Sequence, residues 1–587
     1  MTKMSTVLAC LLAGIVTASL ALPAAGQEVP VPPADQELTA VVSGLQAMIP
    51  SLIKEARIPG LQIALIRDGK IAWHENFGVK NGTTGEPVTD ETIFEAASFT
   101  KPFFAYYAMK LVEQGLLSLD KPLVGYVPAD FVEKFLGHPL DEKGFHRDWF
   151  EKITAREILS HSSGMPHGEQ GTPFPLYFEP GTKWKYSANG YFLLQKVIEY
   201  LKGDKLENLM QKEVLDPLGM TRSCLVWRDD YEKTMANGHG FFGAPEAFRK
   251  RTESHAGASL YTTAEDYAKF VCAVLNGDGL RPETLKEMLA PQIDMDKDKG
   301  LGWSLGFGAQ ADPRGLAIWQ WGDYGIFRNY ILAYPGEKSG VVYLTNSFFG
   351  LGIAPEVCAR GLGAQPLGSI ALNYWHYDSP VYRVGWEVAE KGIEVAGELP
   401  DLAKRFPEAF SKDGIGFLTE AFDGTDKQPG MVALLQFYVK AHPRSGQAQF
   451  GLAQALFQTG DHRQARIYLK KAGRAKEDKV RPFIIKWDLQ YIQALDKPVK
   501  LKESYLKKIA GAYGARHLEV RNGRLYYFRE GGSSPDYRAL VAMSKDTFIL
   551  ETTSSFRLKI GFDKKGHPVK AIGLYDDGRR DETARDK

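Results

Sequence analysis

The sequence predicts a chain of mixed α and β structure in three successive parts: a large part with helices and strands, a helical segment and a small C-terminal β domain. Three observations support this prediction. Two β-rich runs, at 60–67 and 70–77, are joined by Asp-Gly, which is typical of a hairpin. Residues 392–475 have a helical pattern, and alternation with period two returns after about residue 505.

Length and charge limit the classes of function. The chain has 587 residues, too many for one hydrophobic core, so several domains are expected. Its formal net charge is +1, which indicates no strong field for nucleic acid or an anionic membrane surface. Its apolar fraction of 44% and charged fraction of 24% are those of a soluble globular protein.

The first 26 residues predict a secretory signal peptide. Lys3 precedes an apolar run from Val7 to Leu22, and small residues follow it. The alternative is a membrane anchor, but the run is short for a spanning helix and no charge follows to stop transfer. Cys10 comes too early in the run for lipid attachment. We therefore expect secretion, with a periplasmic location and cleavage after Gly26.

The remaining cysteines do not predict a disulfide or a metal site. Cys224, Cys272 and Cys358 are odd in number and lack the spacing of metal ligands. We expect them to be small buried hydrophobic residues, and we expect neither a metal nor a cofactor.

The stretch 95–102 carries the residues most suited to chemistry, Ser98 and Lys101. Ser98 is a good N-cap residue and Pro102 fits the first turn of a helix, so a helix is predicted to begin at Ser98 and to stop at Gly115. Ser98 and Lys101 would then lie on one face of its first turn.

This pair predicts a nucleophile and a base. A serine hydroxyl needs a base, and a lysine serves as one when the positive helix end and burial lower its pKa. The free backbone N–H of Ser98 can face the oxyanion that forms when a carbonyl is attacked. The spacing alone is weak support, because Ser-x-x-Lys occurs four times, at 51/54, 98/101, 118/121 and 504/507.

The surroundings of Ser98 strengthen the prediction. Residues 87–101 resemble the segment around the active serine of the serine β-lactamase-like family, which includes class C β-lactamases, D-alanyl-D-alanine carboxypeptidases, D-aminopeptidases and esterases. Over about residues 38–362 the resemblance implies an α+β (α/β) fold, with an antiparallel sheet flanked by helices and an all-helical subdomain. It also implies that Ser98 is the nucleophile. We expect His74 to be a strand surface residue rather than a catalytic one.

The resemblance places a second catalytic element at 180–191. Family members usually carry Tyr-x-Asn, in which the tyrosine oxygen shares a proton with the serine and lysine and the amide positions substrate or the lysine. Tyr186 fits, but the third position is Ala188 and the amide follows at Asn189. This shift could turn the amide away from the site. The alternative role for Tyr186 is a buried aromatic residue.

Another family-like segment, 153–166, contains Glu157, Ser160 and His161, which suggest a second triad. The resemblance implies that this segment is instead an architectural helix and turn near the site. Residues 300–303 also resemble a family segment and predict an edge strand.

The third element is expected at 319–327, where family members carry Lys-Thr-Gly or His-x-Gly. Gln320 occupies the position of the lysine or histidine, Gly322 is retained, and the N–H of Asp323 becomes the expected second oxyanion donor. A neutral amide gives no charge-assisted contact with a substrate carboxylate. This departure favours neutral esters or amides.

The C-terminal part predicts two appendages. Within the helical segment 392–475, residues 452–472 resemble a tetratricopeptide helix pair, but about three repeats are needed for an independent array, so a spacer and a partner-binding groove both remain open. Residues 505–582 contain an Asn522-Gly523 hairpin signal and resemble the lipocalin-like β domain of many family members. The charged tail 576–587 is expected to fray.

Taken together, these patterns predict an exported serine hydrolase that works through an acyl-enzyme on esters or amides of small molecules or D-amino-acid peptides. A true β-lactamase ranks lower. Either Lys101 or Tyr186 could be the base, and their titrations would be coupled. The alternative is a non-catalytic binding or regulatory protein, with a protein partner at the helical segment. Neither nucleic acid nor an integral membrane segment is expected after cleavage.

Overall fold

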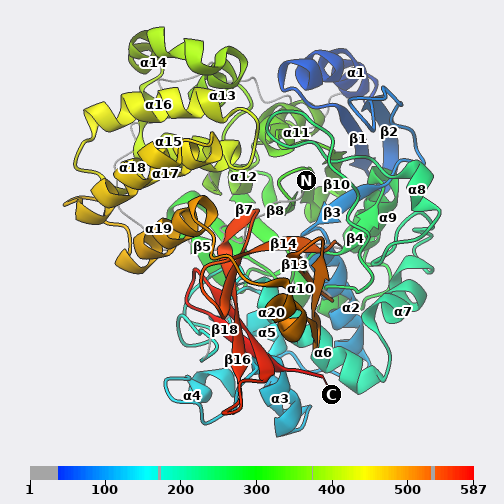
Figure 1. Cartoon of the computed structure of the whole chain (residues 1–587). Helices are drawn as coiled ribbons and strands as arrows, with labels where there is room; N and C mark the ends of the chain where they lie inside the picture. Colours follow the sequence, from blue (N-terminus) through cyan, green and yellow to red (C-terminus); the bar gives the residue numbers. More distant parts are fainter. Residues whose placement is uncertain (1–37, 169–172, 373, 531–535, 587) are drawn as a thin grey trace. The chain divides into compact units, whose positions relative to one another are not determined.

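The computed structural model describes residues 38–168, 173–372, 374–530 and 536–586 (Figure 1). The predicted signal peptide lies outside the described residues. The described chain folds as two compact units, the first ending at Ser379 and the second beginning at Pro380.

The first unit is built on an antiparallel sheet. Leu61, near the start of the unit, pairs with Thr345 from its late part, so the two ends of this unit meet in the sheet. Asp68 and Gly69 both have positive φ, as the Asp-Gly hairpin signal predicts. Within the described residues the strand order is β2 (Lys70–Gly78), β1 (Gly60–Arg67), β10 (Ser339–Thr345), β9 (Arg328–Tyr334), β8 (Gly315–Asp323), β7 (Gly308–Asp312), β6 (Leu301–Trp303) and β5 (Ile293–Asp296).

The strand predicted at the sheet edge, 300–303, is instead the second strand from the edge. It forms β6, while β5 is the edge strand. The reason is the turn at Gly300, whose φ of 66° lets the chain before it fold back and pair with β6.

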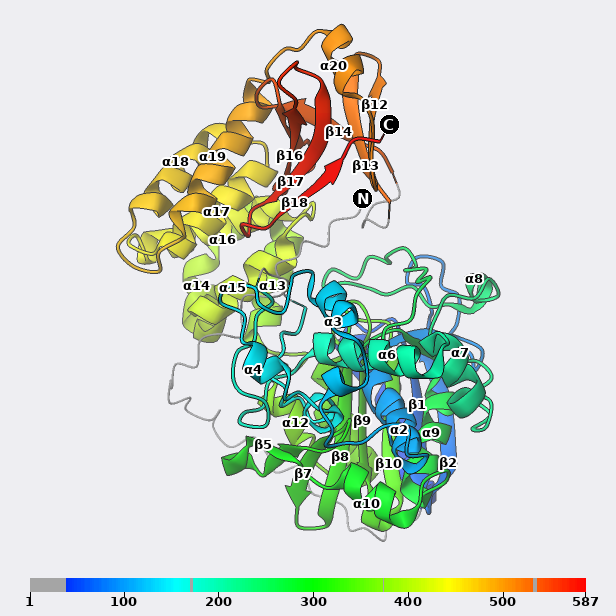
Figure 2. The same ribbon diagram turned by 90° about the horizontal axis from the view of Figure 1, so that it is seen from below.

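Helices surround this sheet and form a subdomain at one side of it (Figures 1 and 2). They are α1 (Leu38–Glu55), α2 (Thr100–Glu113), η1 (Leu123–Gly125), α3 (Ala129–Leu136), α4 (Arg147–Phe150), α5 (Ala155–Leu159), α6 (Ala188–Lys202), α7 (Leu206–Met210), η2 (Gln211–Leu215), α8 (Tyr231–Thr234), α9 (Ala264–Asn276), α10 (Pro282–Leu289), η3 (Lys297–Lys299), η4 (Pro335–Glu337), η5 (Gly350–Ile353), α11 (Ala354–Leu362) and α12 (Leu367–Ala371).

Both faces of the central strands are covered, which explains why β1 is buried over almost its whole length. Ala64 and Ile66 belong to the buried cluster that α2 and α9 share. Leu65 points to the other face, where it approaches Gly361 of α11. An antiparallel sheet with both faces covered and an adjoining helical subdomain confirms the predicted fold class.

The N-cap of the helix after Ser98 lies one residue later than predicted. The first residue of the helix is Thr100, and the N-cap is Phe99, which makes no side-chain capping bond. Ser98 is not the cap because β3 (Phe94–Ala97) pairs with β4 (Leu260–Thr262) through Ala97, so a turn at 98–99 must precede the helix. Gly115, with φ of 71°, follows the helix end as expected.

The helical part of the second unit begins at Pro380. The predicted pair of helices is present, and Gly460, with φ of 85°, turns the chain between them. Its helices are α13 (Pro380–Lys391), η6 (Gly392–Gly397), α14 (Leu399–Arg405), η7 (Pro407–Phe410), α15 (Lys412–Phe422), α16 (Gln428–Ala441), α17 (Gly446–Gln458), α18 (His462–Arg474), α19 (Pro482–Asp496) and α20 (Glu503–Ile509).

The second unit ends in a β domain, as predicted. Each strand pairs with the next in a nearly closed, barrel-like sheet, and both Asn522 and Gly523 have positive φ in the predicted hairpin turn. The strands are β11 (Gly511–Tyr513), β12 (Arg516–Arg521), β13 (Arg524–Arg529), β14 (Arg538–Ala542), β15 (Thr547–Leu550), β16 (Thr553–Phe562), β17 (Pro568–Tyr575) and β18 (Arg580–Ala584).

The prediction that the charged tail frays is wrong over its described residues. Residues 580–584 form β18, in which Ala584 pairs with Lys570 of β17. The Lys570 ammonium lies 3.0 Å from the Glu582 carboxylate, so a charged residue of the tail forms an ion pair across the two strands.

Two further expectations concern the chain as a whole. Cys224 and Cys358 are buried, as expected, whereas Cys272 is only half-buried, and all three are free thiols. Among the described residues, no helix is both long enough and apolar enough to span a membrane.

Candidate active site

The structure brings Ser98 and Lys101 into contact. Ala97 has φ of 50°, so the chain turns sharply as it leaves β3 and presents Ser98 at a half-buried position. Lys101, fully buried in the first turn of α2, donates from Nζ to Ser98 Oγ at 3.1 Å and to the Gly257 carbonyl at 2.8 Å. A positive φ is costly for alanine and is often found at functional turns.

Burial changes the chemistry of Lys101. It lowers the pKa of the ammonium to about 7, because burial makes the charged form less stable than the neutral amine. A substantial share of molecules therefore carries a neutral amine at neutral pH, and a neutral amine can accept the proton of Ser98.

Side-chain hydrogen bonds fix the turn that carries Ser98. The Thr100 hydroxyl donates to the Ala97 carbonyl at 2.7 Å and accepts the Leu260 N–H at 2.9 Å. Tyr267 of α9 donates to the Phe99 carbonyl at 3.0 Å. The turn is thereby attached to β4 and α9.

Tyr186 lies against the same pair of residues. Lys101 Nζ is 4.5 Å from the centroid of its ring, and Gln320 Nε2 donates to its hydroxyl oxygen at 3.1 Å. Burial raises the pKa of Tyr186, while hydrogen bonds with Ser98 and Gln320 act in the opposite direction. The phenol thus contacts both members of the Ser98–Lys101 pair.

His161 supports Tyr186 and forms no second triad among the described residues. Its ring is 4.2 Å from the Tyr186 ring, and its Nδ1 accepts the Ser187 N–H at 3.1 Å. Burial lowers the pKa of His161 well below its ordinary value, so it is neutral. Glu157 bonds back to the N–H of Thr154 as a capping box at the start of α5. The segment is therefore architectural, as expected.

Gln320 joins β8 to the nucleophile turn. Gln320 is fully buried. Besides its bond to the Tyr186 hydroxyl, Nε2 lies 3.1 Å from the Ser98 carbonyl oxygen and 3.0 Å from the Trp321 carbonyl oxygen. These acceptors require the nitrogen side of the amide, so Gln320 acts as a neutral donor where a lysine or histidine was expected.

Gly322 lets β8 approach the nucleophile strand. A Cβ atom at this position would lie only 2.3 Å from the Ala96 carbonyl oxygen. No larger residue fits there without moving the backbone.

The Asp323 N–H leaves β8 on the side opposite β9. Tyr324 N–H bonds to the Phe327 carbonyl, so the next pair, Asp323 and Arg328, is a non-hydrogen-bonded pair whose amides point outward. Pairing with β7 ends at Trp319, so β7 does not cover this edge. The Asp323 carboxylate accepts from the Gly325 N–H at 2.6 Å and from Arg328 Nε at 3.1 Å.

Asn189 lies one turn beyond Tyr186. It is half-buried in the first turn of α6, whose N-cap is Ser187. The Gly257 carbonyl accepts from Lys101 Nζ. The role of Asn189 in positioning substrate or Lys101 stays a prediction.

One site residue escaped the sequence analysis because it acts through its backbone. Gly257 offers a carbonyl to Lys101, and its N–H donates to His255 Nδ1 at 3.0 Å. A Cβ atom at Gly257 would lie 3.1 Å from the His255 ring and 3.4 Å from Lys101 Nζ. The glycine between two alanines was the signal that could have indicated this close approach.

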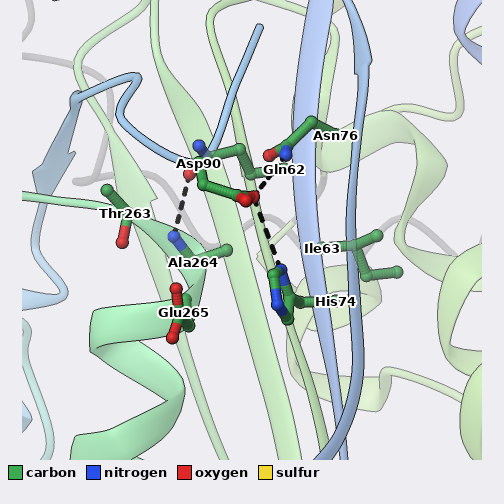
Figure 3. Close-up of a pocket in the computed structure, with 8 residues that line it drawn as sticks. All are labelled: Gln62, Ile63, His74, Asn76, Asp90, Thr263, Ala264 and Glu265. Atoms are coloured by element: carbon green, nitrogen blue, oxygen red, sulfur yellow. Dashed lines mark hydrogen bonds and ion pairs between the residues drawn. The ribbon is translucent and has the colours of Figure 1, made fainter. Parts of the chain in front are cut away.

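A separate pocket lies away from these residues (Figure 3). Its cavity volume of about 10 Å³ suits one water molecule. His74 and Asp90 line it with 3.5 Å between them, and His74 lies at the strand surface as expected. Among the described residues, no group of three or more His, Cys, Asp or Glu side chains is placed to hold a metal ion.

Comparison with known proteins agrees with this geometry. The model of the family described as Beta-lactamase matches residues 45–356, more than half of the chain. The chain belongs to the β-lactamase family. This is a family of serine hydrolases, whose members share the fold described above.

Several members of the β-lactamase family resemble the chain. The esterase EstB of Burkholderia gladioli is 24% identical over 53% of this chain and 92% of its own length. The lovastatin esterase of Penicillium rubens is 27% identical over 42% of this chain and 73% of its own length. An octameric penicillin-binding protein homologue from Pyrococcus abyssi is 20% identical, covering 93% of this chain and all of its own, with a TM-score of 0.45.

Proposed function

We propose that the protein is a serine hydrolase that forms an acyl-enzyme on Ser98. The observation that carries this proposal is the 3.1 Å contact between Lys101 Nζ and Ser98 Oγ, made by a lysine whose pKa burial lowers to about 7. A neutral amine at this distance can take the serine proton as the hydroxyl attacks a carbonyl.

The steps follow from the groups around Ser98. Its Oγ bonds to the substrate carbonyl carbon, and its proton passes to the Lys101–Tyr186 pair. The N–H groups of Ser98 and Asp323 stabilise the oxyanion. The pair then returns the proton to the leaving alcohol or amine, and a water molecule releases the acyl group by the same sequence in reverse. Lys101 and Tyr186 both remain candidates for the base.

The substrate class follows from Gln320. A fully buried neutral amide replaces the cation that would face a substrate carboxylate, so uncharged esters or amides are favoured over penicillins. The esterase names of two relatives point the same way. Small esters rank first, D-amino-acid peptides next and β-lactams last.

The remaining predictions concern location and the appendages. Export to the periplasm rests on the signal-like sequence at 1–26. The helical part of the second unit is proposed to be tetratricopeptide-like, acting as a spacer or as a site for a protein partner. The barrel-like sheet is proposed to be lipocalin-like.

Mass spectrometry of the intact protein tests the nucleophile. The mature chain is incubated with a fluorophosphonate, a small aryl ester and a penicillin. We expect one fluorophosphonate adduct, which Ser98→Ala abolishes together with at least about a 1,000-fold loss of ester turnover. Ser118→Ala is the matched control, because Ser118 and Lys121 have the same spacing at an exposed position.

The same experiment separates the alternative. Ester turnover that survives Ser98→Ala would contradict the proposed mechanism. A folded protein that forms no adduct and turns over no ester would instead be a non-catalytic binding or regulatory member of the family.

A further inference from the structure

The segment after α11 packs back onto the sheet beyond the end of the family match. Here residues 364–372 and 374–379 are called the strap. Gln310 of β7 donates to the Gln365 carbonyl at 2.9 Å and accepts the Leu367 N–H at 3.0 Å. Gly368 of α12 lies directly against the Trp319 indole, so closely that a Cβ atom would be 2.4 Å from the ring. The α12 part of the strap thus lies beside β7 and β8 (Figure 2).

The strap also contacts Asp323, the residue proposed as an oxyanion donor. Tyr374 donates its hydroxyl to Asp323 Oδ2 at 2.8 Å, and the Trp321 indole hydrogen-bonds the same phenol. The Arg328 guanidinium lies 5.3 Å from the Tyr374 ring. Burial and the neighbouring Asp323 carboxylate raise the pKa of Tyr374, so the phenol keeps its proton and remains a donor.

Asp323 is therefore fixed from both faces of β8. Side chains alternate along a strand, so Gln320 and Gly322 face the nucleophile turn while the Asp323 side chain leaves on the other face. Gly322 rests against the Ala96 carbonyl, and the Asp323 carboxylate is held by Tyr374. The peptide between Gly322 and Asp323, which carries the outward-pointing N–H, lies between these two contacts.

The contact between Tyr374 and Asp323 also holds the negative charge of the Asp323 carboxylate in place. A carboxylate on the residue whose N–H stabilises an oxyanion would oppose the developing negative charge if it turned toward the site. Hydrogen bonds from Tyr374, Arg328 and the Gly325 N–H occupy the carboxylate on the far face.

We propose that Tyr374 is a positioning residue of the active site. The strap sets the orientation of the Asp323 N–H and keeps the carboxylate away from the acyl oxygen. This inference rests on the proposed function of Ser98 and Asp323, and it extends the catalytic unit past the family match to at least residue 374.

Full-length Tyr374→Phe is the test, because it removes only the hydroxyl. We expect kcat for a small aryl ester to fall about 10-fold with KM nearly unchanged, since a loosened donor weakens the transition state more than the ground state. Labelling by a fluorophosphonate should slow to a similar extent. Tyr343→Phe is the matched control: its buried hydroxyl also makes a 2.8 Å bond, to the Gly350 carbonyl, and its kcat should stay within about twofold of the parent.

A double-mutant cycle shows whether Tyr374 acts through Asp323. In an Asp323→Ala background, Tyr374→Phe should have little further effect on kcat, because no carboxylate is left to hold. An undiminished loss in that background would overturn the inference. So would a Tyr374→Phe enzyme no slower than Tyr343→Phe, provided that turnover is lost in Ser98→Ala. Turnover that persists in Ser98→Ala would overturn the proposed function itself, whatever Tyr374→Phe does.

Discussion

Gln320 donates a hydrogen bond from Nε2 to the hydroxyl oxygen of Tyr186 at 3.1 Å. The phenol oxygen thereby accepts from a neutral group, at the position where the family resemblance implies a lysine or histidine. A neutral donor favours the phenolate less than an ammonium would. Position 320 therefore offers no charge-assisted contact to a substrate carboxylate.

Gln320→Lys should therefore change substrate preference. We expect the ratio of kcat/KM for a carboxylate-bearing ester to that for a neutral ester to rise about 10-fold, because an ammonium gives a charge-assisted contact. Steady-state kinetics with a matched pair of aryl esters measures this. Gln320→Met, of similar length but without donors, should slow both esters together. An equal change for both esters in Gln320→Lys would show that residue 320 does not face the carboxylate.

The pH profile of the enzyme should report Lys101. Burial lowers the pKa of this residue to about 7, and only its neutral form accepts a proton. We expect kcat/KM to fall about 10-fold per pH unit below pH 7 and to level off above it. Initial rates between pH 5 and 9 test this prediction. A profile that stays flat across this interval would remove Lys101 from the proton transfer.

The same burial should make Lys101 costly for stability. Between pH 7 and the pKa of an unfolded lysine, about 10.4, the unfolded chain binds a proton that the folded chain does not. The cost is greatest at or below pH 7 and disappears as the pH approaches 10. Lys101→Met should abolish turnover yet raise the free energy of unfolding by about 1–3 kcal/mol at pH 7. Urea unfolding at pH 7 and 9.5 measures it, and an equal gain at both values would contradict the assignment.

Gly322→Ala should separate β8 from the nucleophile turn. Its Cβ atom would meet the Ala96 carbonyl oxygen at 2.3 Å, which forces the backbone to move. We expect a loss of about 1–3 kcal/mol in stability and about 100-fold in kcat/KM. Gly336→Ala is the control, because no atom lies within 4 Å of the position its Cβ would take. Full activity in Gly322→Ala would show that this close approach is not needed.

His376 in the strap should make stability depend on pH. Burial alone would lower its pKa, but hydrogen bonds with Glu356 and Asp378 outweigh burial and raise the pKa to about 8. A raised folded pKa gives stability that is complete below about pH 6.5 and is lost as the pH rises through 8. The difference in Tm between the parent and His376→Gln should therefore shrink from pH 6 to pH 9. A difference that does not vary with pH would contradict the charged pairing.

The local features of the fold could be predicted from sequence. Both hairpins depend on a short local signal. Positive φ occurs at two adjacent residues in each turn, Asp68-Gly69 and Asn522-Gly523, and these residue types favour it. The spacing of Ser98 and Lys101 likewise brings them together once a helical turn forms between them. Such features depend on a few neighbouring residues only.

Long-range features were not accessible in this way. The start of α2 at Thr100 depends on the pairing of Ala97 with β4, which lies far along the chain. Gly257 acts through its backbone carbonyl, a group that every residue has, so its residue type does not reveal the role. Strand β18 forms by pairing with the free edge of β17. The contact of Tyr374 with Asp323 joins positions 51 residues apart, so no local sequence pattern predicts it.

The strap has a consequence for how such proteins are classified. A comparison restricted to residues 45–356 contains the serine, the lysine and the tyrosine but omits Tyr374. Relatives grouped by that region alone are compared at the catalytic residues but not at the residue that contacts Asp323 of β8. Sorting them into subfamilies would therefore require sequence alignments that continue to Ser379.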